Sequence, residues 1–216
     1  MLVIAACAAL VALGIALVVS RGGAQDEGPE MGWPRSLAVS LGAGVAAGIL
    51  AAGAGGRLVM RVLGATSTDV HGLTTEAGET IGKITAGGTL AFVLFAGVPA
   101  GLLSGALYAL LAPVLPGGRA RGVLLGAVLL VLFATRVEPL RADSIDFLLL
   151  EPAWVAVAGF SALALFQGML VAALAPPPSA VRRPGMVLAG RIAVALVLLA
   201  ALPGFIDATA DILGDA

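Results

Sequence analysis

The amino-acid sequence predicts an all-α, polytopic membrane protein with about six transmembrane helices and short interfacial helices on the outer side. Of the 216 residues, 60% are hydrophobic and only 12% are charged, whereas a water-soluble domain carries roughly a quarter of its residues as charges. The hydrophobic residues form runs, and about 20 residues of helix suffice to cross the bilayer core. A net charge of -1 offers no basic surface field for nucleic acid, so we expect none as a partner.

Six apolar runs form one transmembrane domain over residues 1–216, and each predicts a helix. These runs cover residues 1–19, 37–56, 89–115, 122–135, 153–175 and 186–202. The first run lacks the basic n-region and the cleavage site of a secretory signal, so we expect an uncleaved helix. The fourth run is shorter than the bilayer core is thick, which makes it the weakest of the six crossings.

The distribution of basic residues predicts the orientation. If all six helices cross, the connections at residues 20–36, 114–121 and 176–185 share one side. Two of them, "GGRARG" and "PPPSAVRRPG", carry arginine without any acidic residue. Basic loops remain in the cytoplasm, so we expect both termini to face outward. The abundance of alanine, glycine and arginine, with Lys83 as the one lysine, indicates a GC-rich bacterial genome and hence the bacterial cytoplasmic membrane.

Small residues recur every four positions on two of the predicted helices. The second run carries Gly44, Gly48, Ala52 and Gly56, and the third carries Gly97, Gly101 and Gly105. Helices in lipid associate through close backbone approach, because no hydrophobic drive pushes them together. We therefore expect the second and third helices to pack against each other at the centre of the protein.

The charged residues that demand most explanation are Arg57 and Arg61, one helical turn apart at the end of the second run. Like charges at this spacing repel unless something neutralises them. The candidate carboxylates are Glu76, Glu79 and Glu151. We interpret this outer charged cluster as a structural clamp, with lipid phosphate and a transported or sensed ligand as the alternatives.

Other polar residues predict structure rather than chemistry. Gln167 and Tyr108 lie within apolar runs, where they are expected to donate hydrogen bonds between helices. Arg191 is placed to snorkel toward the cytoplasmic face. Pro99 should kink the third helix, because it frees the carbonyl of Phe95.

Two segments on the outer side predict short helices outside the membrane core. "TTEAGETIGK", residues 74–83, begins with threonines suited to cap a helix and glutamates suited to its first turn. Gly87 and Gly88 then separate this helix from the third crossing, or bend it. In the C-terminal "FIDATADILGDA", aspartates recur every four residues, which is typical of an interfacial segment with a wet acidic face.

No motif of a known intramembrane enzyme is present. Ser104 lies in "GLLSG", one residue longer than the serine-protease motif G-x-S-G, and His71 is the one histidine and lies in a loop. The sequence also lacks H-E-x-x-H and the Gly-rich phosphate loops. We therefore expect no catalytic residues, no metal site and no cofactor.

The segments "GRLVMRVLGATS", "GLTTEAGETIGKITAGGTL" and "EPLRADSIDFLLLEP" resemble a family of multi-pass membrane proteins of actinobacteria and related high-GC bacteria that has no assigned activity. The resemblance covers residues 37–175. It implies a membrane protein in which the arginine and glutamate segments belong to one feature, and it supplies no catalytic residues.

These observations favour a non-enzymatic integral membrane subunit that associates with itself or serves another membrane protein. Its partners are then the lipid bilayer and a second membrane-embedded chain. The alternative is a small ion or solute transporter or channel, whose outward-facing vestibule is lined by Arg57, Arg61, Glu76 and Glu79.

Overall fold

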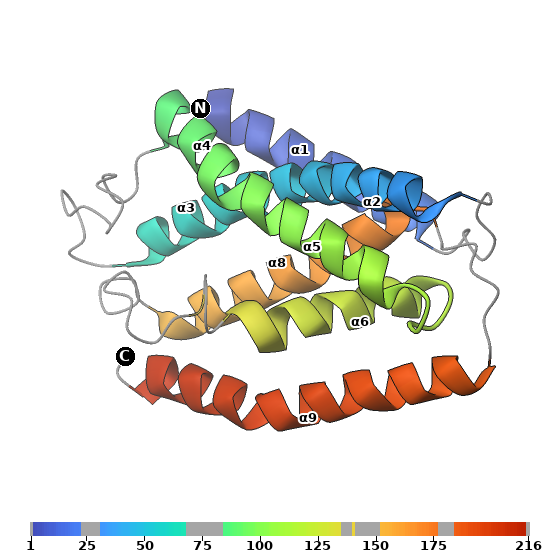
Figure 1. Ribbon diagram of the computed structural model, residues 1–216. Helices are drawn as coiled ribbons and strands as arrows, with labels where there is room; N and C mark the ends of the chain where they lie inside the picture. Colours follow the sequence, from blue (N-terminus) through green and yellow to red (C-terminus); the bar gives the residue numbers. More distant parts are fainter. Residues whose placement is uncertain are drawn as a thin grey trace.

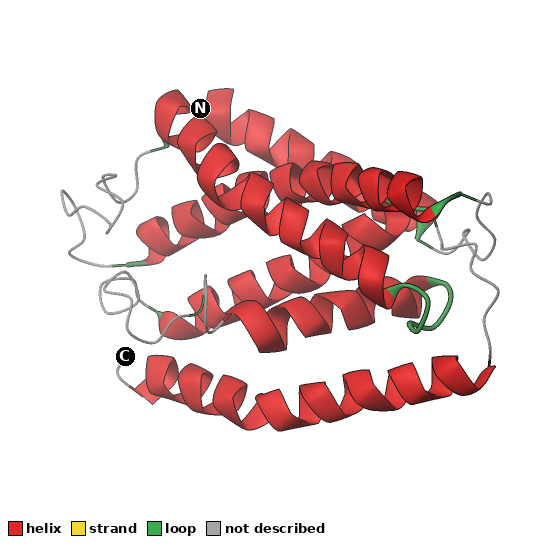
Figure 2. Cartoon of the chain, in the orientation of Figure 1, coloured by secondary structure: helices red, strands yellow, loops and turns green. Residues whose placement is uncertain are grey.

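The computed structural model describes residues 2–22, 31–67, 84–134, 140, 152–176 and 184–214. Throughout these residues the regular structure is helical, without a strand (Figure 2). The predicted all-α class is therefore confirmed.

Six helical rods make up the described chain (Figure 1). Their segments are α1 (Leu2–Arg21); α2 (Trp33–Gly48), η1 (Ile49–Gly55) and α3 (Gly56–Thr66); α4 (Ala86–Phe92), η2 (Val93–Gly97) and α5 (Val98–Leu111); α6 (Arg119–Leu129) and η3 (Leu130–Ala134); α8 (Ala153–Leu174); and α9 (Pro184–Gly214). The η segments are π-helical turns that continue the helices on either side of them. Five of the rods are long and apolar enough to cross a membrane. The short α6–η3 rod is the exception, at the position of the weakest predicted crossing.

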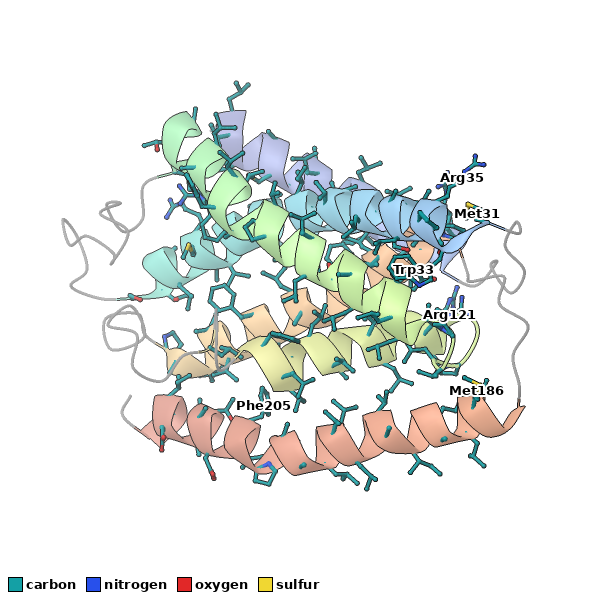
Figure 3. The ribbon with its side chains drawn as sticks, viewed as in Figure 1. Met31, Trp33, Arg35, Arg121, Met186 and Phe205 are labelled. Carbon is teal, nitrogen blue, oxygen red and sulfur yellow. The ribbon has the colours of Figure 1, made fainter. Side chains whose placement is uncertain are left out.

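Successive rods run up and down, so that their ends gather at two opposite sides of the bundle (Figure 1). The end of α1 and the start of α2, the end of α5 and the start of α6, and the end of α8 and the start of α9 lie together at one side. Arg35, Arg121 and Met186 mark this side in Figure 3. The rod ends that these three connections join are therefore grouped as predicted, and the start of α1 and the end of α9 lie at the opposite side.

The second rod is longer than the sequence predicted. We expected it to end at residue 56, with the arginines at its exit, but the helix runs without interruption from Trp33 to Thr66. The expectation was wrong because an arginine ends a hydropathy window without ending a helix. The residues of α3 carry no proline or C-terminal glycine cap, and the chain becomes extended only at Ser67.

The last rod is also longer, since α9 continues from Pro184 to Gly214 instead of ending near residue 202. The C-terminal segment, which we expected to form a separate interfacial helix, is the second part of α9. Pro203 lies inside this helix and does not end it. Asp207 and Asp211 are exposed on this extension, as the predicted acidic face requires.

The third rod begins at Ala86, so Gly87 and Gly88 neither separate it from a preceding helix nor bend it; they form its first turn. Thr85 caps this start, because its hydroxyl accepts a hydrogen bond from the backbone N–H of Gly88 at 3.0 Å. Pro99 is the second residue of α5, two positions after the end of the π-helical η2. A proline cannot donate to the carbonyl four residues earlier, and the wider turn lies at this missing bond.

Two helix pairs form the densest contacts of the bundle, α2 with α5 and α6 with α8. The first pair is the one that the glycine stripes predicted. In addition, α8 contacts α1, α2, α3 and α5, so the fifth predicted helix is as central as the second and third. The largest buried cluster joins apolar residues of α1, α2, α5, α6 and α8 around Tyr108, Leu125 and Leu170.

Candidate functional site

The predicted packing glycines lie where α2 crosses α5. A Cβ atom added at Gly101 would come within 2.5 Å of the Gly44 carbonyl oxygen and 2.7 Å of the Val45 Cα. At Gly44, Gly48 and Gly105 an added Cβ would likewise meet backbone of the facing helix, and at Gly97 it would lie 3.1 Å from the Gly48 carbonyl oxygen. The two helices can therefore approach this closely only because these side chains are absent.

Gly56 has a different neighbour from the rest of its stripe. A Cβ atom there would lie 2.9 Å from Cε1 of Phe92, so this position faces an aromatic ring on α4 instead of a glycine backbone. The stripe loses its glycine partner here because the third rod carries Phe92 and Val93 at this level. A Cβ atom at Gly53, about one turn earlier, would meet the Val93 side chain in the same way.

A second glycine contact, between α6 and α8, was not predicted. A Cβ atom at Gly168 would meet the backbone of Gly122 and Gly126, and one at Gly126 would lie 2.6 Å from the Leu165 Cα. The spacing of Gly122 and Gly126 is the sequence signal that could have revealed it. On α8 the matching signal is a stripe of small residues every four positions, Ala164, Gly168 and Ala172. Added Cβ atoms at Gly126 and Gly122 would also meet Ala164 and Ala172.

Gln167 on α8 connects three helices through its side-chain amide. The amide orientation that satisfies both ends has Nε2 donating to the carbonyl of Ala47 at 2.9 Å. Its Oε1 then accepts from the Ser104 hydroxyl at 2.9 Å and from the backbone N–H of Gly48 at 3.2 Å. This orientation is assigned from the hydrogen-bond network. Gln167 and Ser104 are 5% and 0% exposed, so the predicted interhelical role of Gln167 is confirmed, whereas that of Ser104 was missed.

The polar node formed by Gln167, Ser104, Ala47 and Gly48 lies directly before the π-helical η1. A side chain that bonds to the helix backbone competes with the regular bonding of the helix and is a recognised cause of such distortions. Two other polar residues, expected respectively to bond between helices and to snorkel, make contacts near the ends of the rods. Tyr108 donates a long hydrogen bond, 3.4 Å, to the carbonyl of Pro176 after α8. Arg191 donates from Nε to the carbonyl of Val114 at 3.1 Å.

Of the charged cluster, the structure places Arg57 and Arg61 inside α3, with different exposure. Arg57 is 6% exposed, and Arg61 is half-buried. The expectation that both lie at the helix exit is therefore wrong. Arg57 lies about 14 Å before the end of the helix at Thr66, given a rise of 1.5 Å per residue. Its burial depends on the rods that cover it, and no local sequence signal predicts that.

The surroundings of Arg57 come from α1, η1 and α4. The guanidinium carbon lies 5.9 Å from the centre of the Phe92 ring, within the range of a cation–π interaction. The buried thiol of Cys7 on α1 is close enough to interact electrostatically with Arg57. Both η1 and the start of α3 pack against α1. Arg57 is thus buried beside the Phe92 ring, in the part of the second rod that packs against α1.

Within the described chain, two nitrogens of Arg57 have no hydrogen-bond partner. Both Nε and Nη2 are buried and unpaired. Buried polar atoms are normally bonded, and a buried unpaired charge is especially costly. The carboxylates expected to neutralise this side chain, Glu76, Glu79 and Glu151, lie outside the described residues, so the clamp stays a prediction.

Two of the three π-helical segments, η1 and η2, contact each other, and Arg57 is the second residue after the end of η1. Such single wide turns are rare in helices and are frequent at functional sites. Arg57 with Phe92, next to η1 and η2, is therefore the candidate functional site of this protein.

Comparison with protein-family models, with curated proteins and with solved structures finds no significant match. The resemblance to actinobacterial membrane proteins accordingly stays a prediction. Function has to be inferred from the geometry of this chain alone.

Proposed function

We propose that this chain is a non-enzymatic integral membrane subunit that associates with a second copy of itself through α9. The observation that carries the proposal is the low burial of this helix. In its membrane-spanning part 6% of the residues are buried, against 17–50% in the other four spanning rods. Every other spanning rod is thus more fully enclosed by the chain's own helices than α9 is.

One stripe of α9 attaches it to the rest of the chain. Residues at spacings of three, four and seven, among them Leu198, Ala201, Phe205 and Ile212, are buried or half-buried. Phe205 and Ile212 belong to a buried cluster with α3, α8 and the end of the α6–η3 rod, and Figure 3 shows Phe205 on α9. The rest of the helix exposes large aliphatic side chains, which another membrane-embedded helix can cover as readily as lipid does.

Disulfide crosslinking tests this association. In a Cys7→Ala background, Leu196→Cys and Leu199→Cys place thiols on the exposed face of α9, where the leucines are 60% and 64% exposed. We expect mild oxidation of native membranes to yield a covalent dimer of both variants, detected by non-reducing electrophoresis. Phe95→Cys is the matched control, because Phe95 is 77% exposed on η2, another spanning rod.

The two sites distinguish association from random collision. Equal crosslinking at Leu196 and Phe95, or none at either, would contradict the proposal. A crosslink from α9 to a different protein would instead identify an accessory subunit, the other form of the predicted function.

We further propose that the protein resides in the cytoplasmic membrane of a bacterium with both termini outward. Support comes from the rod ends that the basic connections join, which lie at the side of the bundle opposite the start of α1 and the end of α9 (Figure 1). A fluorescent protein fused to the C-terminus should therefore stay dark when exported unfolded, while a fusion in the 112–118 connection should fluoresce. Bright fluorescence of the C-terminal fusion would reverse the orientation.

A further inference from the structure

The guanidinium of Arg57 has one buried edge without hydrogen-bond partners. Its unpaired atoms, Nε and Nη2, lie on the same side of the planar group, so that their N–H bonds point in parallel. This is the edge with which arginine holds two oxygens of one carboxylate or phosphate. Nε and Nη2 therefore form one unpaired pair of parallel donors, a fork that a single ligand can fill, instead of two unrelated unpaired atoms.

The same guanidinium already has an aromatic neighbour. Its carbon lies over the Phe92 ring, 5.9 Å from the ring centre, and the ring fits there because position 56 is glycine: a Cβ atom would lie 2.9 Å from the ring. An aromatic face stabilises the cation without using any of its N–H groups. The residues of the site thus hold the charge in place and leave its hydrogen-bonding edge unused.

The position of Arg57 in the fold also favours a bound ligand over solvation of its side chain by water or by loose contact with lipid headgroups. Arg57 is 6% exposed, whereas Arg61, one turn later, is half-buried. An intramembrane charge is costly, and such residues generally face the bundle interior, where they mark a binding or transport pathway. The adjoining η1 and η2 supply the locally widened helices that are frequent at such sites.

We propose that Arg57 binds one phosphate group inside the bundle, with Nε and Nη2 each donating to a different oxygen. The phosphate comes from a lipid headgroup or from free inorganic phosphate, which present the same pair of oxygens to the fork. The site does not depend on self-association through α9. It is, however, the feature that solute transport, the alternative function, would require.

The test is the melting temperature of the purified, delipidated full chain in detergent, measured with two phosphate sources. Inorganic phosphate is compared with chloride at equal ionic strength, and dioctanoyl phosphatidylglycerol with dioctanoylglycerol, which lacks the phosphate. We expect the melting temperature to rise in one of these pairs, because a ligand that binds only the folded state stabilises it. The pair that responds identifies the source.

Two lysine variants make the measurement specific. Arg57→Lys keeps the charge but cannot form two parallel hydrogen bonds, so the ligand-induced rise should be lost. Arg61→Lys, one turn away, should retain it. Because phosphate also stabilises proteins by exclusion from their surface, the difference between these variants is the decisive quantity. An equal rise in both, or no rise with either source, overturns the proposal.

A neutral variant separates a ligand site from the predicted clamp. In ligand-free protein, Arg57→Met removes a buried charge without a partner, so its melting temperature should rise above that of the wild type. If a glutamate carboxylate fills the fork, the melting temperature should fall instead. A fall that is non-additive with Glu76→Gln, Glu79→Gln or Glu151→Gln would establish the clamp and overturn the proposal.

Discussion

Replacing Gly101 with leucine is expected to separate α2 from α5 and to prevent the bundle from folding. The Cβ atom alone would lie 2.5 Å from the Gly44 carbonyl oxygen and 2.7 Å from the Val45 Cα. Both are backbone atoms, so no side-chain rotation can relieve the clash and the helices must move apart. Overpacking of this kind costs about 3 kcal/mol or more. We expect the variant to aggregate or to lose its cooperative thermal transition in detergent.

Gly42, on the facing helix α2, provides the matched control. It is exposed, and a Cβ atom there would meet nothing within 4 Å. Gly42→Ala should therefore leave the packing unchanged and raise stability by up to about 1 kcal/mol, since alanine favours the helix over glycine. If Gly101→Leu retained the wild-type melting temperature, the close approach of α2 and α5 would be incidental.

Replacing Gln167 with leucine is expected to lower stability by about 1–2 kcal/mol, the range for interhelical and buried hydrogen bonds. The substitution leaves the Ala47 carbonyl, the Gly48 N–H and the Ser104 hydroxyl without their shared partner. Of these, the Ser104 hydroxyl retains an alternative, because its Oγ lies 3.0 Å from the Gly101 carbonyl oxygen. The loss should be visible as a lower melting temperature of the detergent-solubilised protein.

A double-mutant cycle with Ser104→Ala identifies the interaction. Because both residues belong to one network, the combined loss should be smaller than the sum of the two single losses. Ser20→Ala is the control, since the exposed Ser20 hydroxyl bonds only to its own helix, at 2.7 Å from the Ala16 carbonyl. Additive losses at Gln167 and Ser104 would show that the amide does not couple the helices.

The glycine contact between α2 and α5 was predictable because both partners carry the signal. Gly44 and Gly48 on one helix, and Gly101 and Gly105 on the other, repeat at the period of one helix face, so sequence spacing alone aligns them. The contact between α6 and α8 carries a weaker form of the same signal, which was missed. There Gly168 fits between Gly122 and Gly126, and its stripe on α8 is continued by alanines, Ala164 and Ala172.

The exposure of the two arginines of the charged cluster, in contrast, was not predictable from the sequence. Sequence placed Arg57 and Arg61 together and made them conspicuous, but it assigned them the same exposure. In the structure one is buried against Phe92 and the other is half-buried. The ring over Arg57 belongs to another rod, so the exposure of each arginine depends on where separate rods cross, which helical spacing does not encode.

The sequence by itself determined the all-α class, the membrane-spanning character of the rods, their alternation between two sides and the first glycine contact. Each of these follows from properties that add up locally along the chain, namely hydropathy, chain length and helical period. Only the tertiary structure decided the burial of Arg57, the three-helix bonding of Gln167 and the central place of α8. These features depend on which side chains of separate rods contact each other. Whether a polar group inside the membrane is tolerated depends on whether such a contact gives it a partner.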